Sequence, residues 1–546
     1  MCIVEEPEAS FAIVTLHDNG EMMQDRVSSQ LASAIAYQRA GHLADAVKTC
    51  NQILSSHPND FDAIYLLAML HAQQGALPAA VEMFRRAVRL KPHVVDARYN
   101  LAFAMNLVGD HDGALKQYQR ILKLDPRHID AINNCASTLA KLGRFQDAIE
   151  QYRQLIAARP DRAESHYNLS ILLTELERFD EALESARQAI VLQPRYAEAH
   201  FSCAVALYEM NRLEEALSSY DTAIALKPDY VDAHCNRAIL FLLRGDFGRG
   251  WSEMEWRKKR NAADNRRFDK PLWLGDAAIA KRTVLVHWEQ GFGDTIQFSR
   301  FLPLLRELGA DVLFMPQRSL RGLLSTLGGD VQLIEDGAAL PKFDYHCPLL
   351  SLPLAFKTTS ESIPKNVPYL SAEPGRAEKW GHIIGDSGFK IGIAWQGNPT
   401  QSWMGRYAPL SQFERLAKLP GVRLISLQKN EGSEQIGSRP AGMKVETLGD
   451  AFDAGEDAFL DTAAVMKNLD LVITIETSIA HLAGALGVPT WLALKQVPDW
   501  RWMLGRLDSP WYPTMRLFRQ KVRGDWEDVF RRIEEALIEE IASRGE

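Results

Sequence analysis

The chain has 546 residues, which is too many for one hydrophobic core, so its length predicts several domains. An apolar content of 46% and a charged content of 24% are typical of a globular protein and exclude a disordered chain. The net charge of -8 favours no nucleic-acid partner, and no apolar run reaches the ~18 residues of a membrane span.

Residues 1–26 form a lead-in with acids where a secretory signal would carry basic side chains. The six cysteines lie far apart in the sequence and lack the spacing of a metal site, so we expect buried free thiols in a reducing compartment. The sequence therefore predicts a cytoplasmic protein without a bound metal or cofactor.

Residues 27–260 repeat every 34 residues, with six full copies and a degenerate seventh. Each full copy has a glycine at one phase, replaced by Glu177 and Asn211 in two copies, then an alanine and a closing proline. Four copies also carry an aromatic residue four positions after the alanine. Small residues where two helices touch and a proline after the second helix predict a helical hairpin. The glycines are Gly41, Gly75, Gly109, Gly143 and Gly245, and the prolines are Pro58, Pro92, Pro126, Pro160, Pro194 and Pro228. This pattern resembles the tetratricopeptide repeat family, which implies an all-α superhelix with a concave face for protein partners.

One column of asparagines recurs inside these repeats. Its members are Asn100, Asn134, Asn168 and Asn236. An amide offers donors and an acceptor, so such a ladder can hold the backbone of a peptide, or it can bond between neighbouring hairpins. The ladder resembles that of the repeat domain of O-linked N-acetylglucosamine transferases, which implies a protein or peptide client on the concave face.

Residues 261–280 form a linker, and we expect Trp251, Trp256 and Trp273 to pack the parts around it together. After the linker, apolar strands alternate with helices, which predicts an α/β domain of two parallel sheets with a cleft between them. The expected strands of the first unit, residues 281–375, are Thr283–Trp288, Asp311–Met315, Val331–Ile334 and Tyr345–Leu349. Those of the second unit, residues 376–546, are Ile391–Trp395, Val422–Leu427, Leu471–Ile475 and Thr490–Leu494, with a closing helix near Trp526–Ile541.

The first strand leads into the turn EQGFGD and a helix. Gly291 and Gly293 allow a tight turn and a close approach of the backbone. Asp294 followed by Gln297 is a capping pattern, and a capping aspartate that faces a cleft can also act as a base. A dinucleotide fingerprint fits poorly because Ile296 stands in place of the third glycine.

The stretch LDLVITIETSIAHLAGALGVP predicts a buried strand, a turn of small residues and a helix that ends near Gly487. Free backbone N–H groups and the positive end of the helix dipole suit a phosphate at this turn. Thr477 or Ser478 could instead be a simple N-cap, and His481 an ordinary helix residue.

The motifs GFGDTIQFSRFLPLL and DLVITIETSIAHLAGALGVPTW together resemble bacterial heptosyltransferases of glycosyltransferase family 9. That resemblance implies a GT-B-like fold of two small Rossmann-like units, with the acceptor bound at the first and the nucleotide sugar at the second. It also implies a metal-independent, inverting transferase in which Asp294 is the general base and the Gly291 and Gly293 turn lines the cleft.

The same resemblance implies a set of donor-binding residues in the second unit. Thr477 and Ser478, with the helix N-terminus, would take the pyrophosphate. His481 could add a donor, and Glu476 could accept from ribose or sugar hydroxyls. Arg406 would neutralise the leaving diphosphate, although it could be only a surface charge.

Two further residues lie near the same crevice. Lys429 would add a second cation, or could be a loop lysine, and Gln428 suits the edge of a nucleobase. Trp500 or Trp502 could stack on that base, although packing is the simpler role for both.

The expected function is transfer of a sugar from a nucleotide sugar to a protein held by the repeats. One alternative is a scaffold with a non-catalytic transferase-like domain. A second is a heptosyltransferase-like enzyme acting on a glycan or lipopolysaccharide. The short first unit and the repeats point away from the lipopolysaccharide acceptor.

Overall fold

The computed structural model describes residues 24–260, 266–397 and 407–544. Contacts divide the chain into two compact units, the first ending at Leu207 and the second beginning at Tyr208. The boundary lies inside helix α11 (Ala197–Glu209).

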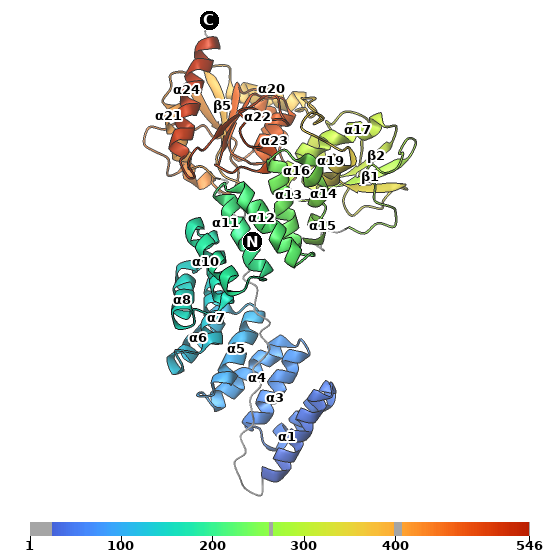
Figure 1. Cartoon of the computed structure of the whole chain (residues 1–546). Coiled ribbons are helices and arrows are strands. Elements are labelled where there is room, and N and C mark those ends of the chain that lie inside the picture. Colours follow the sequence, from blue (N-terminus) through green and yellow to red (C-terminus); the bar gives the residue numbers. More distant parts are fainter. Residues whose placement is uncertain (1–23, 261–265, 398–406, 545–546) are drawn as a thin grey trace. The chain divides into compact units, whose positions relative to one another are not determined.

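Consecutive helices of the first unit pair into hairpins (Figure 1). The turns within the hairpins use left-handed backbone, with φ of 79° at Gly41 and 74° at Gly75. Glu177 and Asn211, which replace glycine at this phase, adopt φ of 57° and 60°, so the repeat phase fixes the turn even without glycine. The helices are α1 (Gln24–Arg39), α2 (Leu43–Ser56), α3 (Phe61–Gln73), α4 (Leu77–Leu90), α5 (Val95–Leu107), α6 (His111–Leu124), α7 (Ile129–Lys141), α8 (Phe145–Ala158), α9 (Ala163–Glu175) and α10 (Phe179–Leu192).

The second unit starts with helices that continue the hairpin pattern. They are α12 (Leu213–Leu226), α13 (Val231–Leu243), α14 (Phe247–Met254) and the short α15 (Arg257–Arg260). Two parallel sheets follow, as the alternation of strands and helices predicts.

The first sheet has the strand order β3-β2-β1-β4. Its strands are β1 (Thr283–His287), β2 (Asp311–Met315), β3 (Gln332–Leu333) and β4 (Tyr345–Pro348), and its helices are α16 (Phe292–Phe298), α17 (Leu302–Glu307), α18 (Arg321–Leu324) and α19 (Leu352–Ala355). Val284 and Val286 face the helices, while Leu285 faces a smaller cluster closed by Phe268 of the linker. The linker also runs along β4, where the Trp273 N–H donates to the His346 carbonyl at 2.9 Å.

The second sheet has the strand order β6-β5-β7-β8-β9. Its strands are β5 (Phe389–Ala394), β6 (Val422–Ser426), β7 (Leu471–Thr474), β8 (Thr490–Leu494) and β9 (Met515–Arg519), and its helices are α20 (Pro374–Ile384), α21 (Glu414–Ala417), α22 (Leu460–Met466), α23 (Ser478–Ala485) and α24 (Trp526–Arg544). Helices α21 and α24 pack on one face, and α20, α22 and α23 cover the other (Figure 1). Strand β9 was not expected, because Arg516 and Arg519 interrupt its apolar pattern at the edge of the sheet.

One continuous hydrophobic core joins α13 and α14 to both sheets. The Trp251 indole N–H donates to the Thr358 carbonyl at 2.9 Å, and its ring packs edge-on against Trp500 at 5.3 Å. Trp251 therefore joins the helical part to the sheets, as predicted. Trp256 does not, because it stacks on His234 of α13 at 3.8 Å, within the helical part.

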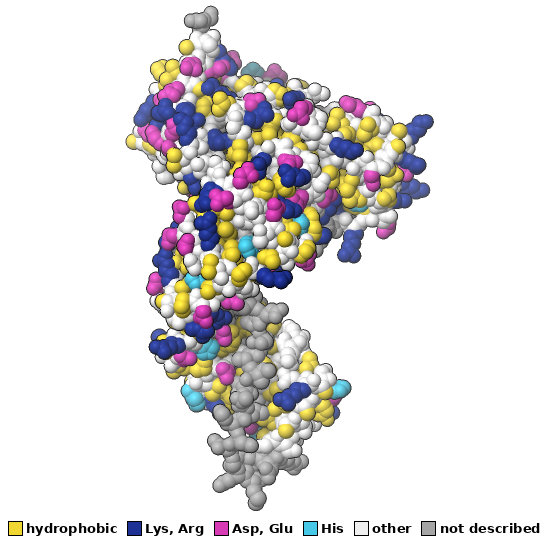
Figure 2. All heavy atoms as spheres, in the orientation of Figure 1, with side chains coloured by type: hydrophobic (Ala, Val, Ile, Leu, Met, Phe, Trp, Pro, Cys, Tyr) yellow, Lys and Arg dark blue, Asp and Glu magenta, His cyan; other side chains and the backbone are white. Residues whose placement is uncertain are grey.

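Figure 2 shows Lys and Arg side chains mostly interspersed with Asp and Glu over the visible face. Among the described helices, none is both long and apolar enough to cross a membrane. Four of the cysteines are buried free thiols: Cys50, Cys135, Cys235 and Cys347.

Candidate functional site

Each sheet has a point where the strand order reverses. In the first sheet this point lies between β1 and β4, and in the second between β5 and β7. Ligands of parallel α/β sheets bind beyond the carboxyl ends of the strands at such switch points. Asp294 lies in the first turn of α16, after β1, and residues 476–478 follow β7, so both candidate turns lie at switch points.

The turn after β1 is held by its own side chain. The Asp294 Oδ2 accepts from the Gly291 N–H at 2.9 Å. Asp294 therefore caps α16 from the third helix position, with Gly291 as the N-cap, and the expected pairing of Asp294 with Gln297 is wrong by one turn. Gln290, one residue earlier, has a φ of 59°. A left-handed non-glycine residue costs on the order of 1–3 kcal/mol and is often found at functional sites.

The turn after β7 presents a different set of groups. Glu476 is buried, and its Oε1 accepts from the Asp499 N–H at 2.6 Å. Thr477 is the N-cap residue of α23, but its side chain makes no capping bond. The His481 Nδ1 lies 3.0 Å from the Tyr512 hydroxyl.

The two turns lie against each other. A Cβ added to Gly293 would come within 2.9 Å of the His481 Cδ2 and 3.5 Å of the Ser478 Cα. Only glycine lets the backbone of α16 approach the first turn of α23 so closely. The structure thus brings together two motifs that lie far apart in the sequence, which is what a site shared by both sheets requires.

Arg501 connects the two turns, and the sequence analysis missed it. Its guanidinium bonds the Asp294 Oδ1, the Gln297 Oε1 and the Asp499 Oδ1, the last at 2.9 Å. Burial works to lower the pKa of Arg501, but Asp499 and Asp294 outweigh burial and raise that pKa above its usual value. The available signal was its place in WRW after the strand Thr490–Leu494, which lies next to β7 in the sheet. Trp500 and Trp502 beside it are buried in the core, which favours packing over base stacking.

Several buried donors near this junction have no hydrogen-bond partner among the described residues. They are the Thr477 Oγ1, the Gln297 Nε2, the Trp502 Nε1 and the Arg519 Nη1. Trp502 stacks on His481 at 5.5 Å, and the Arg519 guanidinium bonds the Trp502 carbonyl at 3.3 Å. Burial lowers the pKa of Arg519, while Glu476 works against that shift. Unpaired buried donors are costly, and a ligand rich in acceptors, such as a diphosphate, would satisfy them.

Two phenylalanines at the edge of this junction were also missed. Phe292 is 39% exposed between Gly291 and Gly293, and its ring packs edge-on against Phe459 at 6.0 Å. Phe459 has a φ of 68°, and the preceding Ala458 N–H donates to the Ser319 carbonyl at 2.7 Å. The segment at Phe459, from the second sheet region, thus contacts the first sheet region, where the Phe292 ring stays partly exposed.

The remaining predicted donor residues are Arg406, Lys429 and Gln428. Arg406 lies outside the described residues. The Lys429 ammonium donates to the carbonyls of Phe452, at 3.0 Å, and Asp453. Gln428 accepts from two backbone N–H groups and donates to two carbonyls, so its amide holds a loop. Their ligand-binding roles stay predictions.

Three members of the asparagine ladder bond to the preceding hairpin. The Asn134 Nδ2 donates to the Tyr99 hydroxyl at 2.8 Å, and Asn100 bonds Tyr65 in the same way. The Asn168 Nδ2 donates to the Asn133 Oδ1 at 3.3 Å. These bonds are the inter-hairpin alternative, but each amide has further bonding capacity, and Asn236 is half-buried. The peptide-binding role therefore stays a prediction.

Within the described ranges there is no cluster of three or more His, Cys, Asp or Glu side chains that could hold a metal ion. The candidate site consists of the turns after β1 and β7, which meet at Gly293, together with Arg501.

Comparison with known sequences identifies the helical part. The tetratricopeptide repeat family matches residues 31–95, 78–129 and 136–199, and a second TPR repeat family matches residues 206–245. The N-terminal half is a TPR array. Its hairpins are the repeats expected from the 34-residue period.

The match to one curated relative is longer than the TPR array. Protein FlbA of Caulobacter vibrioides is 28% identical over 331 residues, which are 56% of this chain and 55% of FlbA. The chain thus spans about half the length of this relative.

Solved TPR structures are similar to part of the chain. YrrB, described as a TPR protein with an unusual peptide-binding site, is 19% identical and covers 34% of this chain and 95% of its own, with a TM-score of 0.30. A tetratricopeptide repeat protein from Parabacteroides merdae is 15% identical and covers 44% of this chain and 93% of its own, with a TM-score of 0.38.

Proposed function

We propose that the chain is a nucleotide-sugar-dependent glycosyltransferase with a GT-B-like cleft, whose TPR array presents a protein acceptor. The observation that carries this proposal is the contact of Gly293 with Ser478 and His481, which joins the two candidate turns. A TPR scaffold supports the protein partner, since stacked hairpins form extended binding surfaces.

In this mechanism the nucleotide diphosphate lies at the first turn of α23. Thr477 and Ser478 bind it together with free backbone N–H groups of the helix, which stabilise the charge of the leaving group. The unpaired donors of Trp502 and Arg519 supply further bonds close by. Asp294 removes the proton from an acceptor hydroxyl, which then attacks the sugar from the face opposite the leaving diphosphate and inverts the anomeric centre.

Asp294 is already bonded on both oxygens, to Gly291 and to Arg501. Each carboxylate oxygen has a second lone pair, so these bonds orient the base without removing its capacity to accept a proton. Asp499 bonds the Nη1 of the same guanidinium whose Nη2 bonds Asp294, which makes Asp499 a matched control.

The first experiment is calorimetric titration of the protein with nucleotide sugars, without and then with a divalent metal. Metal-independent binding of one nucleotide identifies the donor. With that donor, Asp294→Asn keeps an acceptor for the Gly291 N–H, and we expect donor binding to persist while turnover falls about 10²- to 10⁴-fold. Asp499→Asn should change turnover far less. Equal losses in both variants would assign the effect to Arg501 instead of a base.

The second candidate is a scaffold whose sheet region binds no nucleotide. It is favoured by Lys429 and Gln428, whose polar groups are used to hold loops. It predicts that no nucleotide sugar binds in the titration, while the TPR array still binds its protein partner.

A further inference from the structure

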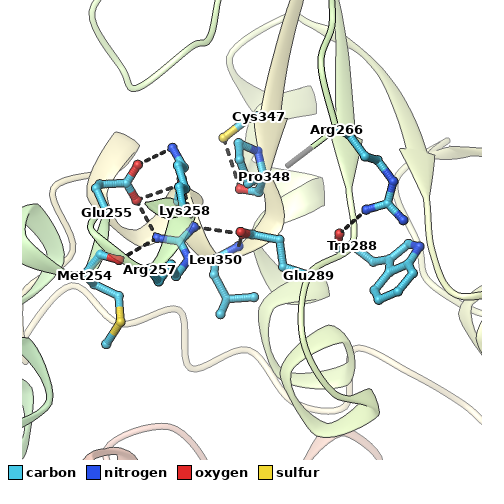
Figure 3. A network of polar contacts seen from close by, with 11 residues as sticks. Met254, Glu255, Arg257, Lys258, Arg266, Trp288, Glu289, Cys347, Pro348 and Leu350 are labelled. Carbon is cyan, nitrogen blue, oxygen red and sulfur yellow. Dashed lines mark hydrogen bonds and ion pairs between the residues drawn. The ribbon is translucent and has the colours of Figure 1, made fainter. Parts of the chain in front are cut away.

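A buried polar network joins the last helical segment to the first sheet. Figure 3 shows the Arg257 guanidinium between the carboxylates of Glu255 and Glu289. Arg257 is 6% exposed and makes bonds of 2.7 Å to both carboxylates. It also donates to the Ser351 Oγ at 2.8 Å, beyond the end of β4. A buried arginine thus binds the helical part and the sheet at once.

The charges of this network balance. Lys258 pairs with the second oxygen of Glu255, so two basic side chains face two acidic ones (Figure 3). Burial works to lower the pKa of Arg257, but Glu289 and Glu255 outweigh it and raise that pKa above its usual value. The guanidinium therefore stays charged, and its planar fork holds each carboxylate in a fixed direction.

Glu289 is the part of the network that bears on the candidate site. It lies two residues after the end of β1 and directly before the left-handed Gln290, so it begins the segment that leads to Asp294 in the first turn of α16. Its Oε2 also accepts from the Leu350 N–H at 3.3 Å, which links the turn to the end of β4, across the switch point of the first sheet. Arg257 thus anchors the side chain at the entrance of a strained turn whose other end is anchored by Asp294 and Gly291.

We propose, on the basis of the transferase function above, that Arg257 is a positioning residue that holds the Glu289–Asp294 turn in its active geometry. The last helical segment is then a structural part of the candidate site. Arg257 touches no substrate and acts only through Glu289 and the turn. Because Gln290 is held in an unfavourable backbone conformation, the turn relaxes when its anchor is removed.

The test compares Arg257→Met with Arg260→Met by amide hydrogen exchange. Arg260 lies on the same short helix, but it is exposed and pairs only with Asp232 among the described contacts. We expect Arg257→Met to speed exchange at Gly291 and Thr295 about ten-fold or more, with α23 unchanged, and Arg260→Met to leave both regions as in the wild type. Unchanged exchange at Gly291, or a uniform increase over the whole sheet, would overturn the proposal.

The rate of sugar transfer provides a second test of the proposal. A misplaced turn lowers kcat about 10- to 100-fold in Arg257→Met and leaves the KM for the nucleotide sugar unchanged, because the donor is bound at α23. Arg257→Lys keeps the charge but loses the fork, so it should recover only part of the rate. If the wild type transfers no sugar, the proposed function fails, whereas the exchange arm still decides whether Arg257 holds the turn. If Arg257→Met does not fold, Glu289→Gln gives the same comparison, since it keeps the acceptor for Leu350 and loses the charge.

Discussion

The TPR hairpins and the junction of the two sheets are built by different rules. In the hairpins, Asn100 bonds Tyr65 and Asn134 bonds Tyr99, each across 35 residues. At the junction, Arg501 bonds Asp294 across 207 residues. Contacts of the first kind repeat with the sequence and can be anticipated from it. Contacts of the second kind depend on how two sheets are connected and packed.

The unfolding of the two units can be followed separately, because only the second unit contains tryptophan. All twelve tryptophans lie at or after Trp251, inside the second compact unit. Tryptophan fluorescence therefore follows the unfolding of the second unit, whereas far-UV circular dichroism also follows the helices of the first.

The largest effect is expected at Arg501. Arg501→Met leaves the partly buried Asp294 and Asp499 without their buried cation, which should lower the free energy of unfolding of the second unit by about 3 kcal/mol. Urea unfolding followed by tryptophan fluorescence measures this loss. Arg506→Met, which breaks a more exposed pair with Asp508, should cost less than about 1 kcal/mol. Similar losses in the two variants would contradict a structural role of the junction.

A pH dependence is also expected in the second unit, from His287. Burial lowers the pKa of His287 from 6.5 to about 3, with Arg266 acting in the same direction, so the unfolded chain binds this proton more readily than the folded chain. The stabilisation that comes from burying neutral His287 is therefore fully present above pH 6.5, and it is lost as the pH falls towards 3. Between pH 7 and 5 the loss from this group is about 2 kcal/mol.

His287→Phe tests that assignment, because its ring can pack beside Phe268. We expect the variant to show a flatter dependence of the urea midpoint between pH 7 and 5. His382→Gln replaces an exposed histidine and should leave the wild-type slope. An unchanged slope in His287→Phe would assign the dependence to other groups.

A smaller loss is expected from Gly293→Ala. Its Cβ would meet the His481 ring at 2.9 Å, so α16 and α23 must move apart, at a cost of about 1–3 kcal/mol to the second unit. Gly248→Ala, in the helix α14, meets no atom within 4 Å and should be neutral or stabilising. Thermal unfolding monitored by fluorescence compares the two, and equal stability would show that the junction is loosely packed.

The smallest effect should appear in the first unit. Asn134→Ala leaves the Tyr99 hydroxyl without this donor, at a cost of about 1–2 kcal/mol. Circular dichroism should detect the loss, while the midpoint of the tryptophan transition stays unchanged. Ser55→Ala, at an exposed helix position, should stay within about 0.5 kcal/mol of the wild type.

The sequence predicted much of the fold because its signals are local. The repeat phase anticipated the turn at Glu177, and β2 and β8 begin and end at the expected residues. Strand β9 was missed because its arginines interrupt the apolar run. Edge strands carry polar residues more often than central ones, which weakens their signal.

The candidate site could be predicted only in part. The turns after β1 and β7 were found because each has a local signature of strand, small residues and helix. Arg501 and Phe459 were not found, because their importance depends on which loops lie beside those turns. Lys429 and Gln428 were predicted to bind a ligand, but in the structure their polar groups hold loops, which their sequence context did not reveal.

The attachment of α13 and α14 to the sheets determines which hairpins of the array can be added or removed without disturbing the sheets. Trp251 lies in the shared core, and Glu209 at the end of α11 pairs with Arg523 at 2.8 Å. Duplication or deletion of a whole hairpin before α11 changes none of these contacts, so the array can gain or lose repeats while the sheet region keeps its fold. A fragment that begins at residue 261 would instead expose the faces of Trp500 and Trp511 that Trp251 covers. The smallest portion that folds alone should therefore include the last hairpins.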